Sequence, residues 1–361
     1  MGLNLLLVFI PIALVLDWFE ANPILVFLAS AISIVPLAGL MGRATENLAV
    51  YVGTTVGGLM TASLGNAPEL IIALSALSKG LTDVVKASIT GGILANLLLA
   101  LGLAMLLGGL RYKRQRFNTT AAGMSAGLLL LAAIGLVVPA LHNFTVEKAE
   151  ELSFEIAVVL FCVYILSLVF TLVTHRQLFR EVETAPEPLP KSSKGTTEEI
   201  KEEEELAWGK NKALGILALV TIAIAVMSEA LTGAIEPAAD SLGLTPIFAG
   251  VILLAGTGAA AELLNAVRFA RKGNMDLAFG IVTGSSTQIA LFVAPVLVFA
   301  SYFMGEPMDL LFTAFEVAAI MLTVLIVARL TTDGECHWME GIMLLGVYLI
   351  LGIGFFYVPV S

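Results

Sequence analysis

Charged residues are scarce in this chain of 361 residues. Asp, Glu, Lys and Arg make up 13% of it and hydrophobic residues 58%, whereas ordinary globular domains have about 25% charged and about 45 to 50% apolar residues. A soluble domain could not bury so much apolar surface. The basic residues, 19 against 29 acidic, leave a net charge of −10 and no surface suited to nucleic acid. The composition predicts an all-α polytopic membrane protein that contacts a lipid bilayer and binds no nucleic acid.

Cysteine and histidine are also rare. Cys162 and Cys336 lack the spacing of a disulfide or metal site, and the three histidines fall in expected loops or at helix ends. A transition-metal site would be expected to recruit His or Cys. The hydrophobic runs also contain no nucleophile beside a base. We therefore expect no enzyme activity and no organic cofactor.

Long apolar runs dominate instead. Eleven runs approach or reach the length of about 17 to 25 residues that crosses a bilayer as a helix. The first lacks the basic start and small-residue cleavage site of a signal peptide, so we interpret it as a retained helix. The runs fall at 3–19, 23–49, 53–78, 83–108, 119–140, 153–175, 212–235, 245–270, 276–303, 309–328 and 339–358.

The basic residues predict an orientation. With eleven spans, 16 of the Lys and Arg residues fall on the side of the N-terminus and 3 on the other side, counted along the sequence. Cytoplasmic loops carry the excess of Lys and Arg in membrane proteins. We expect a multi-pass protein with a cytoplasmic N-terminus and a C-terminus that is external or luminal. A homo-oligomer is compatible with the sequence.

One segment is hydrophilic. Residues 177–211 are rich in Pro, Glu, Lys, Ser and Thr, a composition typical of a solvated linker that cannot bury enough surface to fold. An alternative is a regulatory role, in which an acidic run senses divalent cations or docks on the cytoplasmic face. That run comprises Glu198, Glu199, Glu202, Glu203, Glu204 and Glu205.

The third apolar run contains an ionisable residue, Glu69, just after Gly65, Asn66, Ala67 and Pro68. A carboxylate near the middle of a membrane helix costs about 2.5 to 3.5 kcal/mol and normally lies in a bundle interior or a watery cavity. Proline lacks an N–H, so nearby backbone carbonyls are freed. A carboxylate with free carbonyls suits a hard cation such as Ca²⁺.

The segment around Glu69 is repeated. When Glu262 is placed over Glu69, five further identities among Lys, Gly, Asp and Thr follow without a gap, including Lys272 over Lys79 and Asp276 over Asp83. Each copy spans five runs, an odd number, so the second must cross the membrane upside down. Inverted repeats place substrates near the midplane, on helices that are broken there. We expect an N-terminal helix at 1–20, repeats at 23–176 and 212–358, and a cytoplasmic acidic linker at 177–211.

Two carboxylates in one cavity would titrate as a coupled pair. Protons and a divalent cation would compete for their oxygens, which is the basis of an antiport mechanism. Nearby residues form two further groups of candidates. Residues that could line the cavity or support the carboxylates are Ser63, Gly65, Asn66, Ala67, Asn96, Gly258, Ala260, Asn265, Ser285, Ser286 and Gln288. The polar ones among them could equally be ordinary interhelical contacts. An ion path could include Glu46, Glu229 and Glu236, or these could simply be solvated.

Four motifs resemble the cation/proton exchanger (CAX) family of the calcium/cation antiporter superfamily. They are ATENLA at 44–49, GNAPELIIAL at 65–74, SEALTGAIE at 228–236 and NMDLAFGIVTGSSTQIALFVAPVLV at 274–298. The resemblance implies an eleven-helix Ca²⁺/H⁺ antiporter with one extra N-terminal helix and two inverted five-helix repeats. Its motif residues carry over to Gly65, Asn66, Ala67 and Glu69, to Gly258, Ala260 and Glu262, and to Gln288.

The chain departs from the family pattern at two positions. Ala259 replaces the usual Asn of the second motif, and Leu263 replaces a frequent His. One amide partner of Glu262 is therefore missing, and Asn265 could compensate for it. Exchange of cytoplasmic Ca²⁺ for external or luminal H⁺ is the predicted function. The alternatives are a Na⁺-coupled Ca²⁺ exchanger of the same superfamily and a passive divalent cation channel.

Overall fold

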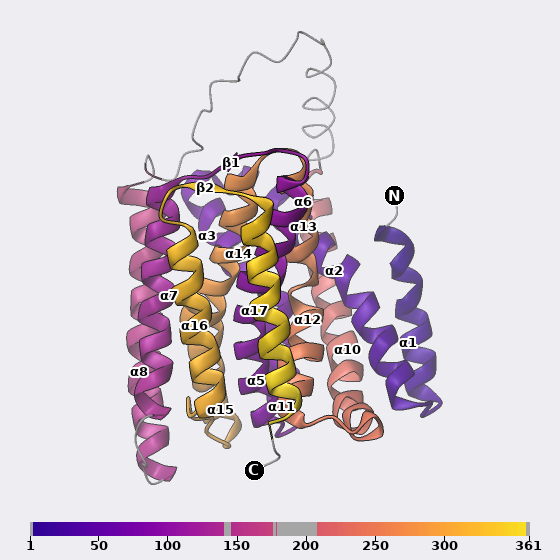
Figure 1. Ribbon diagram of the computed structural model, residues 1–361. Coiled ribbons are helices and arrows are strands. Elements are labelled where there is room, and N and C mark those ends of the chain that lie inside the picture. The colour runs from indigo at the N-terminus through magenta and orange to yellow at the C-terminus, as the bar shows by residue number, and fades with distance from the viewer. Residues whose placement is uncertain (1–2, 141–145, 176–177, 179–207, 359–361) are drawn as a thin grey trace.

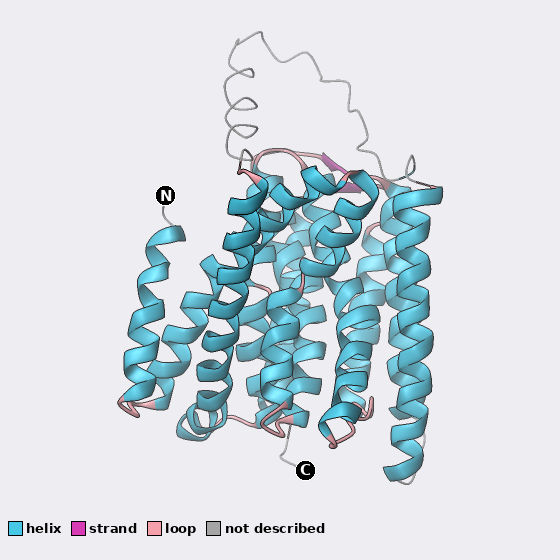
Figure 2. Ribbon diagram, turned by 180° about the vertical axis from the view of Figure 1, so that it is seen from behind, coloured by secondary structure: helices cyan, strands magenta, loops and turns pink. Residues whose placement is uncertain are grey.

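Helices make up almost all of the described chain (Figure 2). The computed structural model describes residues 3–140, 146–175, 178 and 208–358. The predicted acidic linker, with the run from Glu198 to Glu205, lies almost entirely outside the described residues. Within them, the only strands are two short ones that pair antiparallel, Gln115 with Cys336 and Arg116 with Glu335. An all-α fold is confirmed.

The α-helices are interrupted or extended by short 3₁₀-helical and π-helical segments. In order, the elements are η1 (Leu3–Val8), α1 (Phe9–Trp18), α2 (Pro23–Val52), α3 (Thr54–Leu64), α4 (Ala67–Leu77), α5 (Thr82–Leu94), η2 (Ala95–Ala100), α6 (Leu101–Gly109), β1 (Gln115–Arg116), α7 (Thr119–Ala140), α8 (Val146–Val169), η3 (Phe170–Thr174), α10 (Lys210–Leu242), α11 (Pro246–Phe248), η5 (Ala249–Leu254), α12 (Ala255–Gly258), α13 (Ala260–Arg271), α14 (Met275–Gln288), η6 (Ile289–Val293), α15 (Ala294–Met304), α16 (Ala314–Leu330), β2 (Glu335–Cys336) and α17 (Trp338–Phe356).

The helices match the predicted spans. Seven helices of the described chain are long and apolar enough to cross a membrane, or nine if each of two bent pairs counts as one span. α1 and the 17-residue α16 are shorter apolar helices. Together these segments correspond to the eleven predicted runs, so the structure is consistent with eleven spans. Two boundaries were wrong by seven residues. The sixth run was expected to begin at 153, but α8 begins at Val146. The seventh was expected to end at 235, but α10 continues to Leu242 and includes Pro237.

The ends of the chain define two faces of the molecule. The N-terminus, the strand pair and the two ends of the linker lie on one face, and the C-terminus lies on the other (Figure 1). We call the first the linker face and the second the opposite face. This placement agrees with an odd number of crossings.

The buried apolar residues form two clusters. The smaller cluster joins α1, α2 and α10 with a few residues of α4, α5 and the η5 region, such as Ile72, Val84 and Leu254. The larger cluster contains residues of α4 to α8 and of α13 to α17. α2 and α10 therefore pack on each other and form a unit beside the rest of the bundle (Figure 1).

Glycine allows the close crossing of α5 with the α11–η5 segment. A Cβ atom at Gly250 would lie 2.7 Å from the carbonyl oxygen of Val84, and one at Gly91 would meet the backbone of Val251. Real Cβ atoms do not approach backbone this closely, so both positions require glycine. Gly91 thus permits close helix packing, as small residues do in membrane helices.

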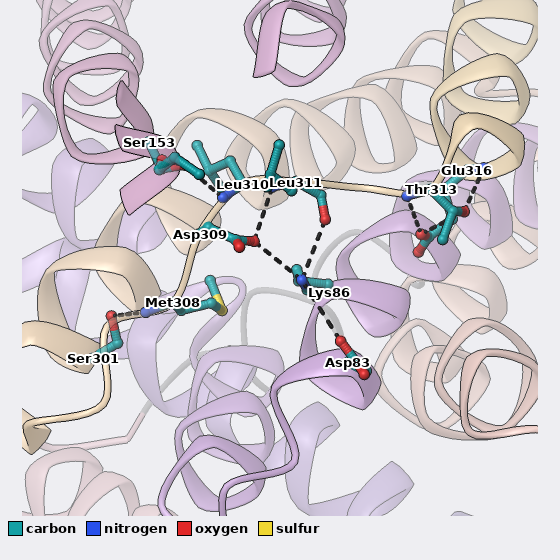
Figure 3. A network of polar contacts seen from close by, with 11 residues as sticks. Asp83, Lys86, Ser153, Ser301, Met308, Asp309, Leu310, Leu311, Thr313 and Glu316 are labelled. Carbon is teal, nitrogen blue, oxygen red and sulfur yellow. Dashed lines mark hydrogen bonds and ion pairs between the residues drawn. The ribbon is translucent and has the colours of Figure 1, made fainter. Parts of the chain in front are cut away.

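A polar network fixes the loop between α15 and α16 on the opposite face (Figure 3). The Lys86 Nζ atom lies 3.1 Å from Oδ1 of Asp309 and donates to the Leu311 carbonyl at 3.2 Å. The Ser153 hydroxyl accepts from the Leu310 N–H at 2.8 Å. The buried Glu316 carboxylate accepts from the N–H and hydroxyl of Thr313. This network anchors a loop that contains buried apolar residues to α5 and α8.

Candidate ion-binding site

Two membrane spans are broken at corresponding places. α3 and α4 meet at an angle of 44°, and α11–α12 and α13 meet at 54°. The first break is at Gly65 and Asn66, with Pro68 in the first turn of α4. The second is at Ala259 and has no proline. Breaks in both repeats agree with the expectation from the sequence.

Each break carries one glutamate at the start of the helix that follows. Glu69 lies in the first turn of α4, and Glu262 in the first turn of α13. The free N–H groups at a helix N-terminus favour a negative charge. The two carboxylates are close enough to repel each other electrostatically. The fold thus joins residues 193 positions apart in the sequence into one acidic pair.

The oxygens of this pair are buried and unpaired. Both carboxylate oxygens of Glu69 and Oε2 of Glu262 have no hydrogen-bond partner among the described residues. The amide oxygens of Asn96 and Gln288 are buried and unpartnered as well. Buried polar atoms without partners are rare and costly in native proteins. All five atoms are acceptors, so protons or a cation would satisfy them.

A hydrogen-bonded network supports the first break. Asn66 donates from Nδ2 to the Ser285 carbonyl at 2.9 Å and accepts from the Ser285 hydroxyl at 3.1 Å. Asn96 donates to the same hydroxyl at 2.9 Å. All three residues are buried. The predicted candidates Asn66, Asn96 and Ser285 therefore form one unit that ties α4 to η2 and α14.

The mirror positions of this network in the other repeat are apolar. At the spacing that separates Glu69 from Glu262, Asn66 corresponds to Ala259, Ser285 to Gly92 and Asn96 to Ile289. These three replacements line one cavity of about 30 Å³ together with Glu69. This volume is enough for one or two water molecules. The site therefore lacks not only the amide at residue 259 but all three polar side chains of the mirror-related network.

The environments of the two glutamates therefore differ. Glu69 lies in the small, mainly apolar cavity, with its Cγ atom against Gly258. Glu262 instead lines a cavity of about 490 Å³ on the linker face. Asn265 and Glu46 line this larger cavity too, as do Arg43 and Arg268. Glu46, a candidate for the ion path, therefore lines the same cavity as Glu262.

The remaining candidates contact residues other than the two glutamates or begin the helices that carry them. Gly65 lies near Gln288: a Cβ atom at residue 65 would be 3.6 Å from the Gln288 amide oxygen. The Ser63 side chain contacts the Tyr164 hydroxyl, and Ser286 donates to the Val282 carbonyl within its own helix. Ala67 and Ala260 begin α4 and α13.

Glu229 and Glu236 are exposed on α10. Glu236 lies inside that helix, not in the loop where it was expected, and lines a cavity of about 190 Å³ with Asp240 on the opposite face.

Three features of the site were not predicted. Gly92 and Ile289 complete the Glu69 cavity, and extending the repeat comparison to the partners of Asn66 would have revealed both. The third feature is a pair of π-helical segments. η2 follows the end of α5 at Leu94, and η6 follows the end of α14 at Gln288. Such turns are often found at functional sites, but the sequence gives no signal for them.

No described part of the chain brings together three or more His, Cys, Asp or Glu side chains that could hold a metal ion. A cation bound by Glu69 and Glu262 would therefore need further oxygens from amides, hydroxyls, backbone carbonyls or water. Ca²⁺ accepts such mixed ligands in flexible geometry.

Comparison with known proteins agrees with this architecture. A Ca²⁺/H⁺ antiporter of Aphanothece halophytica is 45% identical over 98% of this chain and 96% of its own length. A Ca²⁺/H⁺ antiporter of Synechocystis is 44% identical over 98% and 96%. The structure of native YfkE superposes with a TM-score of 0.82 at 34% identity, covering 99% of this chain and 100% of that one.

The profile of the sodium/calcium exchanger protein family matches residues 22–173 and 212–357. The relatives named above are transporters, which confirms that the chain is a multi-pass membrane transporter and not an enzyme. The resemblance to the cation/proton exchangers is confirmed as well. The chain belongs to the sodium/calcium exchanger protein family.

Proposed function

We propose that this protein exchanges Ca²⁺ for H⁺, with both ions competing for the carboxylates of Glu69 and Glu262. The observation that carries the proposal is the group of buried acceptor oxygens without donors around the two helix breaks. One Ca²⁺ ion, or protons on the carboxylates, would satisfy these oxygens. Since the two kinds of ion neutralise the same atoms, binding of one releases the other.

The proposal assigns the chain a two-repeat organisation. Residues 23–176 and 212–358 form the inverted repeats, 1–20 an additional N-terminal helix, and 177–211 a linker between them. The paired breaks and the paired glutamates support this division. We expect the linker to be solvated, with regulation by its acidic run as the alternative.

The linker face is the cytoplasmic one in this proposal. The 16 basic residues that the eleven-span count assigns to this side support the orientation. Cytoplasmic Ca²⁺ would enter the 490 Å³ cavity past Glu46 and reach Glu262. Release on the opposite face requires a second conformation, in which α2 and α10 have moved relative to the rest of the bundle. Their separate apolar cluster supports such a movement.

Transport by the purified protein in liposomes tests the reaction. A pH gradient should drive ⁴⁵Ca²⁺ into the vesicles, and an internal pH dye should report protons leaving as calcium enters. Replacing external sodium by choline should change neither signal. Calcium uptake that requires a sodium gradient would favour the Na⁺-coupled alternative, and calcium flux without proton movement would favour a channel. Either result would contradict the proposal.

A further inference from the structure

Lys79 joins two helices on the opposite face. It follows the end of α4, and its Nζ atom donates to the backbone carbonyl of Glu229, in α10, at 2.6 Å. Gly233 makes room for it, because a Cβ atom there would lie 3.0 Å from Nζ. The lysine therefore contacts the middle of a long helix through a carbonyl group and not through an acidic side chain.

A second contact lies beside the first. The hydroxyls of Ser75 and Thr232 are 2.9 Å apart, and Thr232 also donates to the Ser228 carbonyl within α10. Ile72, one turn before Ser75, is buried among the residues of the α2–α10 cluster. α4 and α10 are thus closely packed on the opposite face, with polar contacts at Ser75 and Lys79.

The mirror-related positions of α2 and α13 line an open cavity on the linker face. By the alignment of Glu46 with Glu236, Glu229, Thr232 and Gly233 of α10 correspond to Gly39, Gly42 and Arg43 of α2. These three α2 residues line the 490 Å³ cavity. Arg268, the counterpart of Ser75, lines the same cavity. Equivalent positions therefore form a closed contact on one face and an open cavity on the other.

We propose that Lys79, together with the Ser75–Thr232 pair, holds the opposite face closed while the linker face is open. This rests on the proposed function, because only a transporter with two alternating conformations needs such a contact. Lys79 is a positioning residue: it does not touch the transported ion, and it acts through the position of α10. In the other conformation α10 leaves α4, and α2 approaches α13 at Gly39 and Gly42.

The structure explains why a lysine is suited to this role. A contact that must break in every cycle should be weak enough to open, and the hydrogen bond of the Lys79 ammonium is exposed, so water screens its charge. A single hydrogen bond of this kind changes an equilibrium between two conformations by about threefold to tenfold. Loss of Lys79 should therefore shift the conformations measurably without unfolding the protein.

The test is the access of a thiol reagent to α10. A Ser228→Cys reporter is introduced into the full chain, in a Cys162→Ala background that retains the buried Cys336. Ser228 is fully buried, one turn before Thr232. A membrane-impermeant thiol reagent is applied from each face in turn, with neither calcium nor a pH gradient present. Lys79→Met should increase the reaction rate from the opposite face by about threefold to tenfold.

Two further variants make the result specific. Lys79→Arg retains a cationic donor and should react as slowly as the parent. Lys148→Met makes the same change at an exposed lysine near the start of α8 on the same face and should also match the parent. An unchanged rate in Lys79→Met would overturn the proposal, as would an equal increase from both faces. Because no transport is measured, this result is independent of whether Glu69 and Glu262 carry exchange.

Discussion

Gly258 lies directly against the Glu69 side chain: a Cβ atom at residue 258 would be 3.0 Å from Cγ of Glu69. The break in one repeat thus forms part of the wall around the carboxylate of the other. Glycine at this position is required by the approach of a functional side chain, not by an unusual backbone angle. Two predictions concern this wall and its counterpart.

Gly258→Ala should displace the Glu69 carboxylate and reduce exchange. The Glu69 side chain would have to move by a few tenths of an ångström. Since a displacement of about 1 Å in a binding group can lower a rate by about a hundredfold, we expect a loss of about threefold to tenfold in the initial rate of calcium uptake. Gly256→Ala is the matched control, because nothing lies within 4 Å of a Cβ at that position. Equal activity of the two variants would contradict the proposed contact.

The apolar cavity beside Glu69 predicts non-additive effects on stability. Gly92→Ser should destabilise the protein, because its Cβ would lie 3.0 Å from Cδ1 of Ile289. Ile289→Asn and Ala259→Asn would each bury an amide without a partner, at a cost of about 1 to 3 kcal/mol.

Combined, the three substitutions reproduce the Asn66–Ser285–Asn96 network in the mirror position. The triple variant should therefore be more stable than the sum of its parts by about 0.5 to 3 kcal/mol. Thermal unfolding in detergent measures this coupling. If the triple variant loses as much stability as the three single variants together, the new side chains do not form a network like that of Asn66, Ser285 and Asn96.

Several of these features were predictable from the sequence and others were not. Glu69 and Glu262 stand out because ionisable residues are rare in apolar runs, and their fixed spacing reveals the repeat. The bond between Asn66 and Ser285 spans 219 residues, and many polar residues could have been its partner. Lys79 donates to a backbone carbonyl, and since every residue has one, the sequence could not predict this contact. The end of α10 was misplaced because Pro237 and Glu236 suggested a loop.

The network on the opposite face predicts unequal effects of two aspartates. Lys86→Met would remove the cation beside Asp309, whose side chain is only 24% exposed and would keep only its hydrogen bond from the Leu311 N–H, so we expect a loss of about 1 to 3 kcal/mol in unfolding free energy. Asp83, 80% exposed and 3.6 Å from the same lysine, should contribute less than about 1 kcal/mol. Thermal unfolding of Lys86→Met and Asp83→Asn compares them. A larger loss for Asp83→Asn would contradict this assignment.

Cys336 should be unreactive in the folded protein. Burial, followed by the nearby Glu340 and Asp333 carboxylates, raises the pKa of the Cys336 thiol to about 12. At pH 8 only about one thiol in ten thousand would be ionised, and the thiolate is the reactive form. Iodoacetamide should therefore leave Cys336 unmodified at pH 8 and modify it after denaturation, as mass spectrometry can show. Rapid alkylation of the native protein would contradict its burial.

The central claim is that Glu69 and Glu262 together bind the exchanged ions. Its most direct measurement is ⁴⁵Ca²⁺ uptake driven by a pH gradient in liposomes containing Glu69→Gln or Glu262→Gln, with Glu155→Gln on the exposed surface of α8 as the control. The account predicts that each site variant loses exchange while the control retains it and all three remain folded. Normal exchange by either Glu69→Gln or Glu262→Gln would contradict it.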